Sequence, residues 1–278
     1  MSGTRMAAML ANHSSLDELY EAVEHAHELL VVTGAGISLA SGIPTFRGTD
    51  AGALWKRDVT ELATLSFFLE NPAESWRWYL SRFETLREAE PNAGHLALVE
   101  LEQWQTARDR EFLLVTQNID TLHARAGSER LIEVHGSAAR VRCPSPGCRL
   151  GAPSGSLPRP DAGLESFRAD PSPENLPRCP ECEAPLRPHV LWFDEFYGDH
   201  EDYNWEQVLA AGERADVALF VGTSFSVGVT DLLVRATALR GAPAFSLDPG
   251  AERPPHPSVR VVPAAAEEAL PELVRLLR

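Results

Sequence analysis

Lysine is almost absent from this chain of 278 residues, because Lys56 is the one lysine and every other basic side chain is an arginine. Lys and Arg together number 25 against 40 Asp and Glu, which gives a formal net charge of -15. Such an excess of acid argues against direct nucleic-acid or anionic-membrane partners, since phosphate contacts need Lys and Arg. Long apolar runs and an apolar N-terminal signal are also missing. We therefore expect a cytoplasmic protein.

Cysteine is scarce as well, and its spacing is informative. The four cysteines form a C-x4-C pair, Cys143 and Cys148, and a C-x2-C pair, Cys179 and Cys182. Two such close pairs suit tetrahedral zinc, and four thiolates leave no open position, so the ion would be structural. The alternatives are disulfides, which a cytoplasmic location disfavours, and unrelated buried cysteines. Bound zinc would stabilise a segment too rich in loops to bury a core of its own.

The composition is that of a globular protein, with 44% hydrophobic and 23% charged residues. Short apolar runs are expected to form strands, at residues 29–32, 112–115, 131–134, 139–141, 190–193, 217–221 and 244–247. The intervals are expected to be helical, from Ser15 towards His27 and at residues 58–90, 94–104 and 270–277. Alternating strands and helices predict an α/β fold, a Rossmann-like parallel sheet flanked by helices.

Shifts in composition predict three parts. A large Rossmann-like domain is expected to comprise residues 1–50, 91–138 and 186–278. A helical insertion would occupy residues 51–90. A smaller zinc-binding module would occupy residues 139–185, where Pro, Gly, Ser and Arg are frequent and all four cysteines lie.

A glycine-rich loop follows the first predicted strand. Small residues there allow the backbone to approach a neighbouring group closely, and free N–H groups in such a turn can hold a diphosphate. Gly34 and Gly36 match the dinucleotide fingerprint, but Leu39 stands where its third glycine should be. Phe46 and Arg47 then place an aromatic ring and a fixed cation on the following loop. A tight strand-to-helix turn without a ligand is the alternative interpretation.

Polar residues also follow the other predicted strands. They are Thr116-Gln117-Asn118-Ile119-Asp120, then His135-Gly136, Gly222-Thr223-Ser224 and Asp248. Ligands of α/β proteins bind beyond the carboxyl ends of the strands, so these clusters are expected to converge on one edge. A single histidine there could be a core imidazole. Convergence favours a functional one that accepts a proton near neutral pH.

In order along the chain, these motifs resemble the sirtuin family, the NAD-dependent protein lysine deacylases. The match includes the glycine loop, Pro91-Asn92-Ala93-Gly94-His95, the segment 116–120, His135-Gly136, the four cysteines, Arg187-Pro188-His189-Val190-Leu191-Trp192-Phe193 and Gly222-Thr223-Ser224. The resemblance extends over about residues 25 to 275. It implies NAD as cofactor, one structural zinc ion, acyl-lysine proteins or peptides as substrates, and release of nicotinamide and O-acyl-ADP-ribose.

The resemblance also implies roles for individual residues. His135 would be the general base, with Asn118 as a second catalytic residue, and activity would fall as the pH drops through the pKa of His135. The implied NAD-binding residues are Gly34, Ala35, Gly36, Phe46, Arg47, Gln117, Asn118, Ile119, Asp120, Gly222, Thr223, Ser224, Asp248 and Ala266. Asp248 stands where the family usually has Asn, and its carboxylate can still accept from a ribose hydroxyl.

The implied substrate-binding residues are Tyr79, Arg82, Leu191, Phe193 and Asp194. Tyr79 and Arg82 share a helix face and offer a hydroxyl and a bidentate cation, which suit a carboxylate. This pair resembles the branch of the sirtuins that removes succinyl and malonyl groups; a surface Arg beside a core Tyr is the alternative. Asp194 stands where the family usually has Gly, and we expect its charge to alter peptide binding.

Three other functions share parts of this pattern. The chain could be a mono-ADP-ribosyltransferase, a sensor that binds NAD or ADP-ribose, or an NAD dehydrogenase. The complete set of His135 and acyl-channel motifs opposes the first two, and Leu39 in the fingerprint opposes the third. The products distinguish them: a transferase yields ADP-ribosylated protein, a sensor yields no product, and a dehydrogenase yields NADH.

Overall fold

A computed structural model of the chain describes residues 15–45, 59–250 and 256–278. Its centre is a six-stranded sheet in the order β3-β2-β1-β7-β8-β9, with every neighbouring pair parallel. The strands are β1 (Glu28–Thr33), β2 (Glu111–Thr116), β3 (Leu131–Glu133), β7 (Val217–Val221), β8 (Ala244–Leu247) and β9 (Val259–Val262). The predicted parallel sheet is confirmed. Strand β9 was not predicted, because Arg260 interrupts its apolar run.

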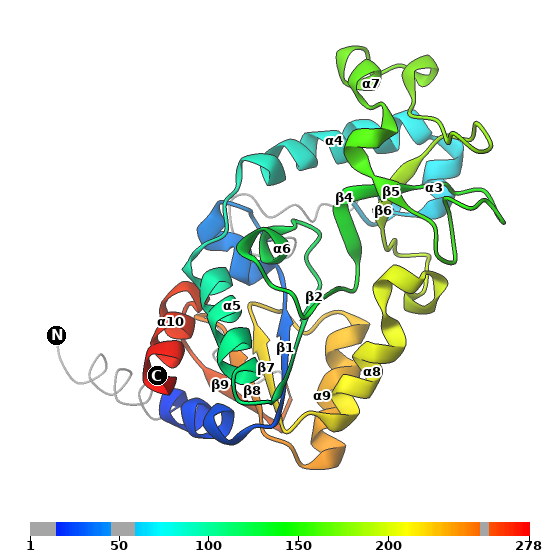
Figure 1. The fold of residues 1–278 in the computed structure, drawn as a ribbon. Coiled ribbons are helices and arrows are strands. Elements are labelled where there is room, and N and C mark those ends of the chain that lie inside the picture. Colours follow the sequence, from blue (N-terminus) through cyan, green and yellow to red (C-terminus); the bar gives the residue numbers. More distant parts are fainter. Residues whose placement is uncertain (1–14, 46–58, 251–255) are drawn as a thin grey trace.

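Helices cover both faces of this sheet (Figure 1). The helix over residues 15–25, α5 (Ala93–Thr106) and α10 (Ala266–Leu277) pack on one face. Helices α8 (Trp205–Arg214) and α9 (Gly228–Arg240) pack on the other. Successive residues of a strand point to opposite faces, so Leu29 and Val31 of β1 lie in the first core while Leu30 and Val32 lie in the second. Burial on both faces explains why the strands read as continuous apolar runs.

The helical insertion is not one helix over residues 58–90. Its described residues, 59–90, form three helices: α2 (Val59–Leu62), α3 (Leu65–Glu70) and α4 (Pro72–Glu88). Thr64 begins α3 as an N-cap whose hydroxyl accepts from the Phe67 N–H, and such a cap has extended backbone that a continuous helix cannot have. Pro72 begins α4, since proline lacks the N–H that a helix interior needs but fits the first turn.

A second, three-stranded antiparallel sheet has the order β5-β4-β6. It contains β4 (Gly136–Arg142), β5 (Leu157–Pro158) and β6 (Arg187–Val190). The strand expected at residues 139–141 therefore belongs to this sheet. The strand expected at residues 190–193 ends at Val190. The small sheet shares one apolar core with α3 and α4, as Figure 1 also indicates.

The remaining helical elements are short. They are α6 (Leu122–Ala126), α7 (Glu165–Ala169) and 3-10 segments at Ala35–Ser41 (η1), Arg159–Ala162, Pro173–Asn175, Tyr197–Asp199 (η4) and Glu201–Tyr203.

The strand order creates a switch point between β1 and β7. The chain leaves β1 towards β2 on one side and returns to β7 on the other side. At such a point the loops beyond the carboxyl ends diverge and leave a crevice for a ligand. The loops after β1, β2, β3, β7 and β8 carry the polar clusters that the sequence singled out.

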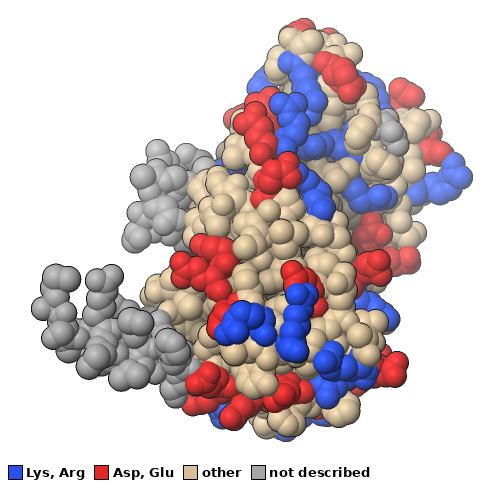
Figure 2. All heavy atoms as spheres, turned by 60° about the vertical axis from the view of Figure 1, so that its left-hand side comes forward, with Lys and Arg blue, Asp and Glu red and all other residues tan. Residues whose placement is uncertain are grey.

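Acidic and basic side chains are interspersed over the described part of the face drawn in Figure 2. None of the helices in the described ranges has the length and apolar character that a membrane span requires.

Candidate functional site

The glycine loop after β1 packs against the loop after β7. The Gly36 N–H donates to the Gly222 carbonyl oxygen at 2.8 Å, and the Gly34 N–H donates to the Val221 carbonyl oxygen at 3.0 Å. A Cβ added at Gly36 would lie 2.6 Å from the Gly222 Cα, and Gly222 has a φ of +58°. The predicted close approach is thus confirmed, and its partner is another loop of the chain. These two amides are not free, contrary to the expectation from the sequence.

A buried polar network joins the loops after β1 and β2. The Ser38 hydroxyl donates to Asp120 Oδ2 at 2.7 Å and accepts from Asn118 Nδ2 at 3.1 Å. Asn118 Nδ2 also donates to the Gly34 carbonyl oxygen at 3.2 Å, and the Leu122 N–H donates to Asp120 Oδ1. Burial raises the pKa of Asp120, against the lowering effect of these donors. Sequence reasoning missed Ser38, since a small polar residue in a turn carries no distinctive signal.

Gln117 connects three of the loops. Its side-chain amide donates to the Thr33 carbonyl oxygen at 3.2 Å and to the Thr223 hydroxyl at 3.1 Å. Thr223 is buried, whereas Ser224 is exposed and its hydroxyl pairs with that of Ser226 at 2.7 Å. The ends of β1, β2 and β7 therefore form one continuous polar floor.

His135 lies in the turn between β3 and β4, with both ring nitrogens engaged. Nδ1 lies 2.9 Å from the Gln117 carbonyl oxygen, which only accepts, so Nδ1 carries the proton of the neutral ring. Nε2 lies 3.1 Å from the Tyr197 hydroxyl and keeps its lone pair. The surrounding atoms desolvate the ring and lower the pKa of His135 to about 4, while the hydrogen bond to Gln117 acts in the opposite direction. The imidazole is thus a neutral base whose accepting atom is Nε2.

Tyr197 is a second residue that sequence reasoning missed. Its ring stacks on His135 with 5.7 Å between centroids and on Trp205 with 4.2 Å between centroids. Burial raises the pKa of Tyr197 to about 12, so the phenol stays protonated and can donate to Nε2. The residue lies in the short segment η4, where no periodic pattern distinguishes it.

Other predicted NAD-binding residues lie around the same edge. Asp248 follows β8 and its Oδ1 accepts from the Gly250 N–H at 2.8 Å. Ala266 is the buried first residue of α10, and Ile119 is partly buried against the core of the small sheet. Ala35 begins η1 beside the glycines. Phe46 and Arg47 fall outside the described residues.

Tyr79 and Arg82 lie on α4 within an aromatic cluster. The Tyr79 hydroxyl accepts from Trp192 Nε1 at 2.5 Å, and its ring meets that of Trp78 edge to face at 4.6 Å. The Arg82 guanidinium lies 3.9 Å from the centre of the Trp78 ring. Burial lowers the pKa of Arg82 and raises that of Tyr79, and each group offsets part of the other's shift. Tyr79 and Arg82 are three residues apart on α4, so their side chains lie on the same face of the helix.

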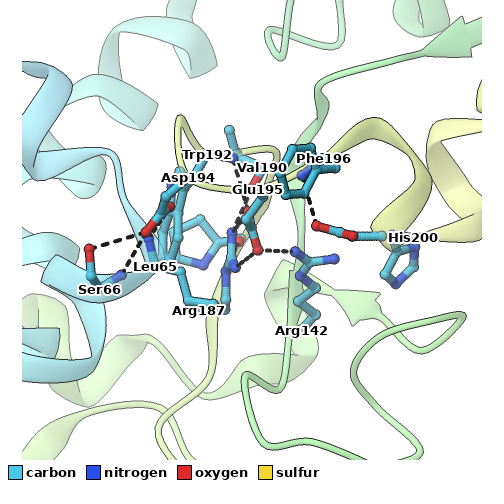
Figure 3. Close-up of polar contacts among 12 residues, drawn as sticks. Leu65, Ser66, Arg142, Arg187, Val190, Trp192, Asp194, Glu195, Phe196 and His200 are labelled. Carbon is cyan, nitrogen blue, oxygen red and sulfur yellow. Dashed lines mark hydrogen bonds and ion pairs between the residues drawn. The ribbon is translucent and has the colours of Figure 1, made fainter.

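The segment after β6 connects the base to the helical insertion. The Leu191 N–H donates to the His135 carbonyl oxygen at 2.9 Å, and the Phe193 N–H donates to the Ala63 carbonyl oxygen at 3.1 Å. Asp194 accepts from the N–H groups of Leu65 at 2.7 Å and Ser66 at 3.0 Å (Figure 3). These donors at the start of α3 lower the pKa of Asp194 against desolvation. The carboxylate is thus directed to α3, which the sequence did not predict.

The four cysteine sulfurs form a single cluster in the small sheet's module. All four lie within 4.8 Å of one another, with 3.5 Å between Cys143 and Cys182 and 3.6 Å between Cys148 and Cys179. Zinc–sulfur bonds of about 2.3 Å at tetrahedral angles put neighbouring sulfurs about 3.8 Å apart. None of the four cysteines forms a disulfide. The donor set therefore fits one structural zinc ion, as predicted.

Comparison with known proteins agrees with this geometry. The model of the Sir2 family matches residues 34–229. The NAD-dependent protein deacylase of Thermus thermophilus is 41% identical over 235 residues, 84% of each chain. The mitochondrial NAD-dependent protein deacylase sirtuin-5 of Canis lupus familiaris is 36% identical over 255 residues, 87% of this chain and 79% of the relative.

A solved Sir2 homolog–NAD complex has the same fold, with a TM-score of 0.76 and 34% identity over 94% of this chain and 93% of the other. The match reaches from the glycine loop into α9, and so includes the loops after β1, β2, β3 and β7 and the cysteine cluster. With this sheet order, this convergence of loops and this identity, the chain belongs to the Sir2 family.

Proposed function

We propose that this chain is an NAD-dependent protein lysine deacylase that prefers acyl groups ending in a carboxylate. The observation that carries the proposal is the neutral His135 at the edge of the sheet, whose Nδ1 proton is committed to the Gln117 carbonyl and whose unprotonated Nε2 accepts from the Tyr197 hydroxyl. When bound, NAD supplies the ribose carbon from which nicotinamide leaves and the hydroxyl that receives the acyl group. The names and ligands of the relatives support this assignment.

Some side chains of the site would bind NAD, and His135 would transfer the proton. The linked side chains of Gln117, Thr223 and Asn118 would hold the ribose and phosphates at the polar floor. Nε2 of His135 would take the proton of a ribose hydroxyl so that its oxygen can attack the acyl carbon. As the ring becomes charged, the Nδ1–H bond to the Gln117 carbonyl stabilises it, which is why this bond raises the pKa.

The pH dependence of the reaction is expected to follow the low pKa of His135. The base must be unprotonated, and with a pKa of about 4 it is almost entirely neutral once the pH is more than about one unit higher. We expect kcat/KM to be nearly flat from about pH 8 down to about pH 5.5 and to fall only as the pH approaches that pKa. Steady-state assays across this range, with tryptophan fluorescence to confirm the folded state, provide the measurement. An acid limb near 6.5, the usual imidazole value, would contradict the assigned environment.

The preference for acidic acyl groups rests on Tyr79 and Arg82. An acyl carboxylate needs donors and a cation in a desolvated place, and α4 provides a phenol and a guanidinium among aromatic rings. An acetyl group has no carboxylate and makes no use of either. Arg is suited because it stays charged even where burial lowers its pKa.

Replacing Arg82 should therefore change selectivity more than activity. A charge-assisted hydrogen bond contributes about 1.5–3 kcal/mol, so Arg82→Met is expected to lower kcat/KM for a succinyl peptide by about 10- to 100-fold. We expect kcat/KM for the acetyl twin to change less than about threefold. The matched control is Arg77→Met, an exposed arginine of α4 that binds the Pro171 carbonyl oxygen. An unchanged succinyl-to-acetyl ratio in Arg82→Met would contradict the acidic-acyl assignment.

The proposed function is tested by mass spectrometry of one peptide carrying succinyl-lysine and of its acetyl twin, each incubated with the protein with and without NAD. NAD-dependent loss of succinyl much faster than acetyl is the expected result. Faster loss of acetyl would keep the deacylase and refute the acyl preference. ADP-ribosylated protein, NADH, or bound NAD without turnover would instead indicate a transferase, a dehydrogenase or a sensor.

A further inference from the structure

Trp192 makes a hydrogen bond that constrains the chemistry of Tyr79. Its indole Nε1 donates to the Tyr79 hydroxyl at 2.5 Å, and both side chains are buried, with 2% and 3% exposure. The indole N–H is a donor only. The phenol oxygen therefore accepts from Trp192, and its own O–H hydrogen cannot be donated to the indole nitrogen. The O–H of Tyr79 is therefore available to donate a hydrogen bond to a ligand.

The indole that imposes this arrangement is itself held from several sides. The Arg187 guanidinium lies 3.4 Å from the centre of the indole, and Phe68 packs at 5.4 Å between centroids. The Trp192 N–H donates to Glu195, which also accepts from Arg187 and Arg142. Figure 3 shows Glu195 between the two guanidinium groups, whereas Asp194 is turned the other way, to Leu65 and Ser66. Both the backbone and the ring of Trp192 are thus fixed.

Arg82 supplies the second half of the arrangement. It lies on the same helix three residues after Tyr79, and the phenol and the guanidinium influence each other's pKa. A carboxylate between them would meet a cation and an O–H hydrogen. A ligand that needed an acceptor would find the oxygen of Tyr79 already used by Trp192.

We propose that Trp192 is a specificity-determining positioning residue, which makes Tyr79 a hydrogen-bond donor for the carboxylate of an acidic acyl group. This inference rests on the proposed function. It adds a residue that touches neither the acyl carboxylate nor NAD and acts through Tyr79 alone. Its removal should weaken recognition of carboxylated acyl groups and leave acetyl groups almost unaffected.

A double-mutant cycle tests the inference, with the succinyl-to-acetyl ratio of kcat/KM as readout. Trp192→Phe keeps an aromatic ring and removes the N–H, and we expect the ratio to fall about three- to tenfold, the effect of one neutral hydrogen bond. Tyr79→Phe should lower the ratio at least as much. Because Trp192 acts through the phenol, Trp192→Phe should have no further effect in the Tyr79→Phe background.

Trp76→Phe is the matched control. Trp76 is buried in the same core and its Nε1 donates to the Leu186 carbonyl oxygen at 2.7 Å, so the change removes an indole hydrogen bond whose acceptor is not Tyr79. We expect its ratio to stay at the wild-type value. A fall in Trp76→Phe equal to that in Trp192→Phe, or additive effects in the cycle, would overturn the inference.

A spectroscopic measurement covers the case in which Trp192→Phe does not fold. The indole N–H resonance of Trp192, one of six tryptophans, should shift in Tyr79→Phe and on addition of succinyl-lysine peptide but not of its acetyl twin. If the Trp192 indole resonance shifts neither in Tyr79→Phe nor on addition of the succinyl-lysine peptide, the inference is overturned. If the wild-type enzyme shows no preference for succinyl over acetyl, both the acidic-acyl assignment and the inference about Trp192 are overturned. If the wild-type enzyme prefers succinyl but the effects of Trp192→Phe and Tyr79→Phe are additive, only the inference about Trp192 is overturned.

Discussion

His135→Asn is expected to lower the rate of deacylation by about 10²- to 10⁴-fold, the contribution of a general base. Asn keeps a side-chain N–H for the Gln117 carbonyl oxygen but has no nitrogen that can accept a proton at neutral pH. The loss should appear in kcat, because the proton is transferred during the reaction and not on binding. Single-turnover assays that follow the deacylated peptide provide the measurement.

Two comparisons make this result specific. NAD affinity, measured by calorimetry, should change little in His135→Asn, because the polar floor of Gln117, Asn118 and Thr223 stays in place. His25→Asn, a change at an exposed histidine of the first helix, should leave the rate at the wild-type value. A His135→Asn enzyme with near-normal turnover would refute the role of this residue as base.

Loss of the metal is expected to have the largest effect on stability. Structural zinc bound by thiolates contributes about 10–16 kcal/mol of apparent binding free energy, and a small loop-rich module has little core to replace it. Cys179→Ser should remove the ion and lower the melting temperature by about 10 °C or more, since each kcal/mol moves a chain of this size by about 2–4 °C. Metal content by mass spectrometry and thermal melts provide the two measurements.

The cysteines share an apolar core with α4, so loss of the metal should also affect residues outside the cysteine cluster. Cys143 and Cys179 belong to the same apolar cluster as Trp76, Tyr79 and Phe83 of α4, so loosening the module should also disturb Tyr79, which we propose to bind the acyl carboxylate. Ser166→Ala, at an exposed position of α7, should leave both metal content and stability unchanged. Full stability of the metal-free protein would show that the sulfur cluster has no structural role.

Sequence reasoning was most successful where one short segment carries the whole signal. Continuous apolar runs predicted five strands of the parallel sheet, and the cysteine spacing predicted the cluster. It failed where the outcome depends on a distant partner. The strand at residues 139–141 joins the small sheet because its partner is β6, far along the chain. The break in the helical insertion was missed for a different reason: it depends on a local N-cap at Thr64, and a search for apolar periodicity does not detect caps.

The candidate site divides in the same way. His135 and Gln117 could be found because a polar residue directly after a buried strand is unusual and the strand fixes its place. Ser38, Tyr197 and Trp192 could not, because each acquires its role only through a contact with another loop or helix. Asp194 was noticed as a departure from the family, but its contact with α3 came only from the structure.

By itself, the sequence determined the class of fold, the order of its motifs and the family, because these depend on neighbouring residues and on spacing along the chain. The tertiary structure alone decided the hydrogen bonds among the side chains of the candidate site. It set the tautomer of His135 through the Gln117 carbonyl and directed the indole N–H of Trp192 to the Tyr79 oxygen. The physical reason is that a hydrogen bond has a direction, and that direction is set by the partner that folding brings within about 3 Å.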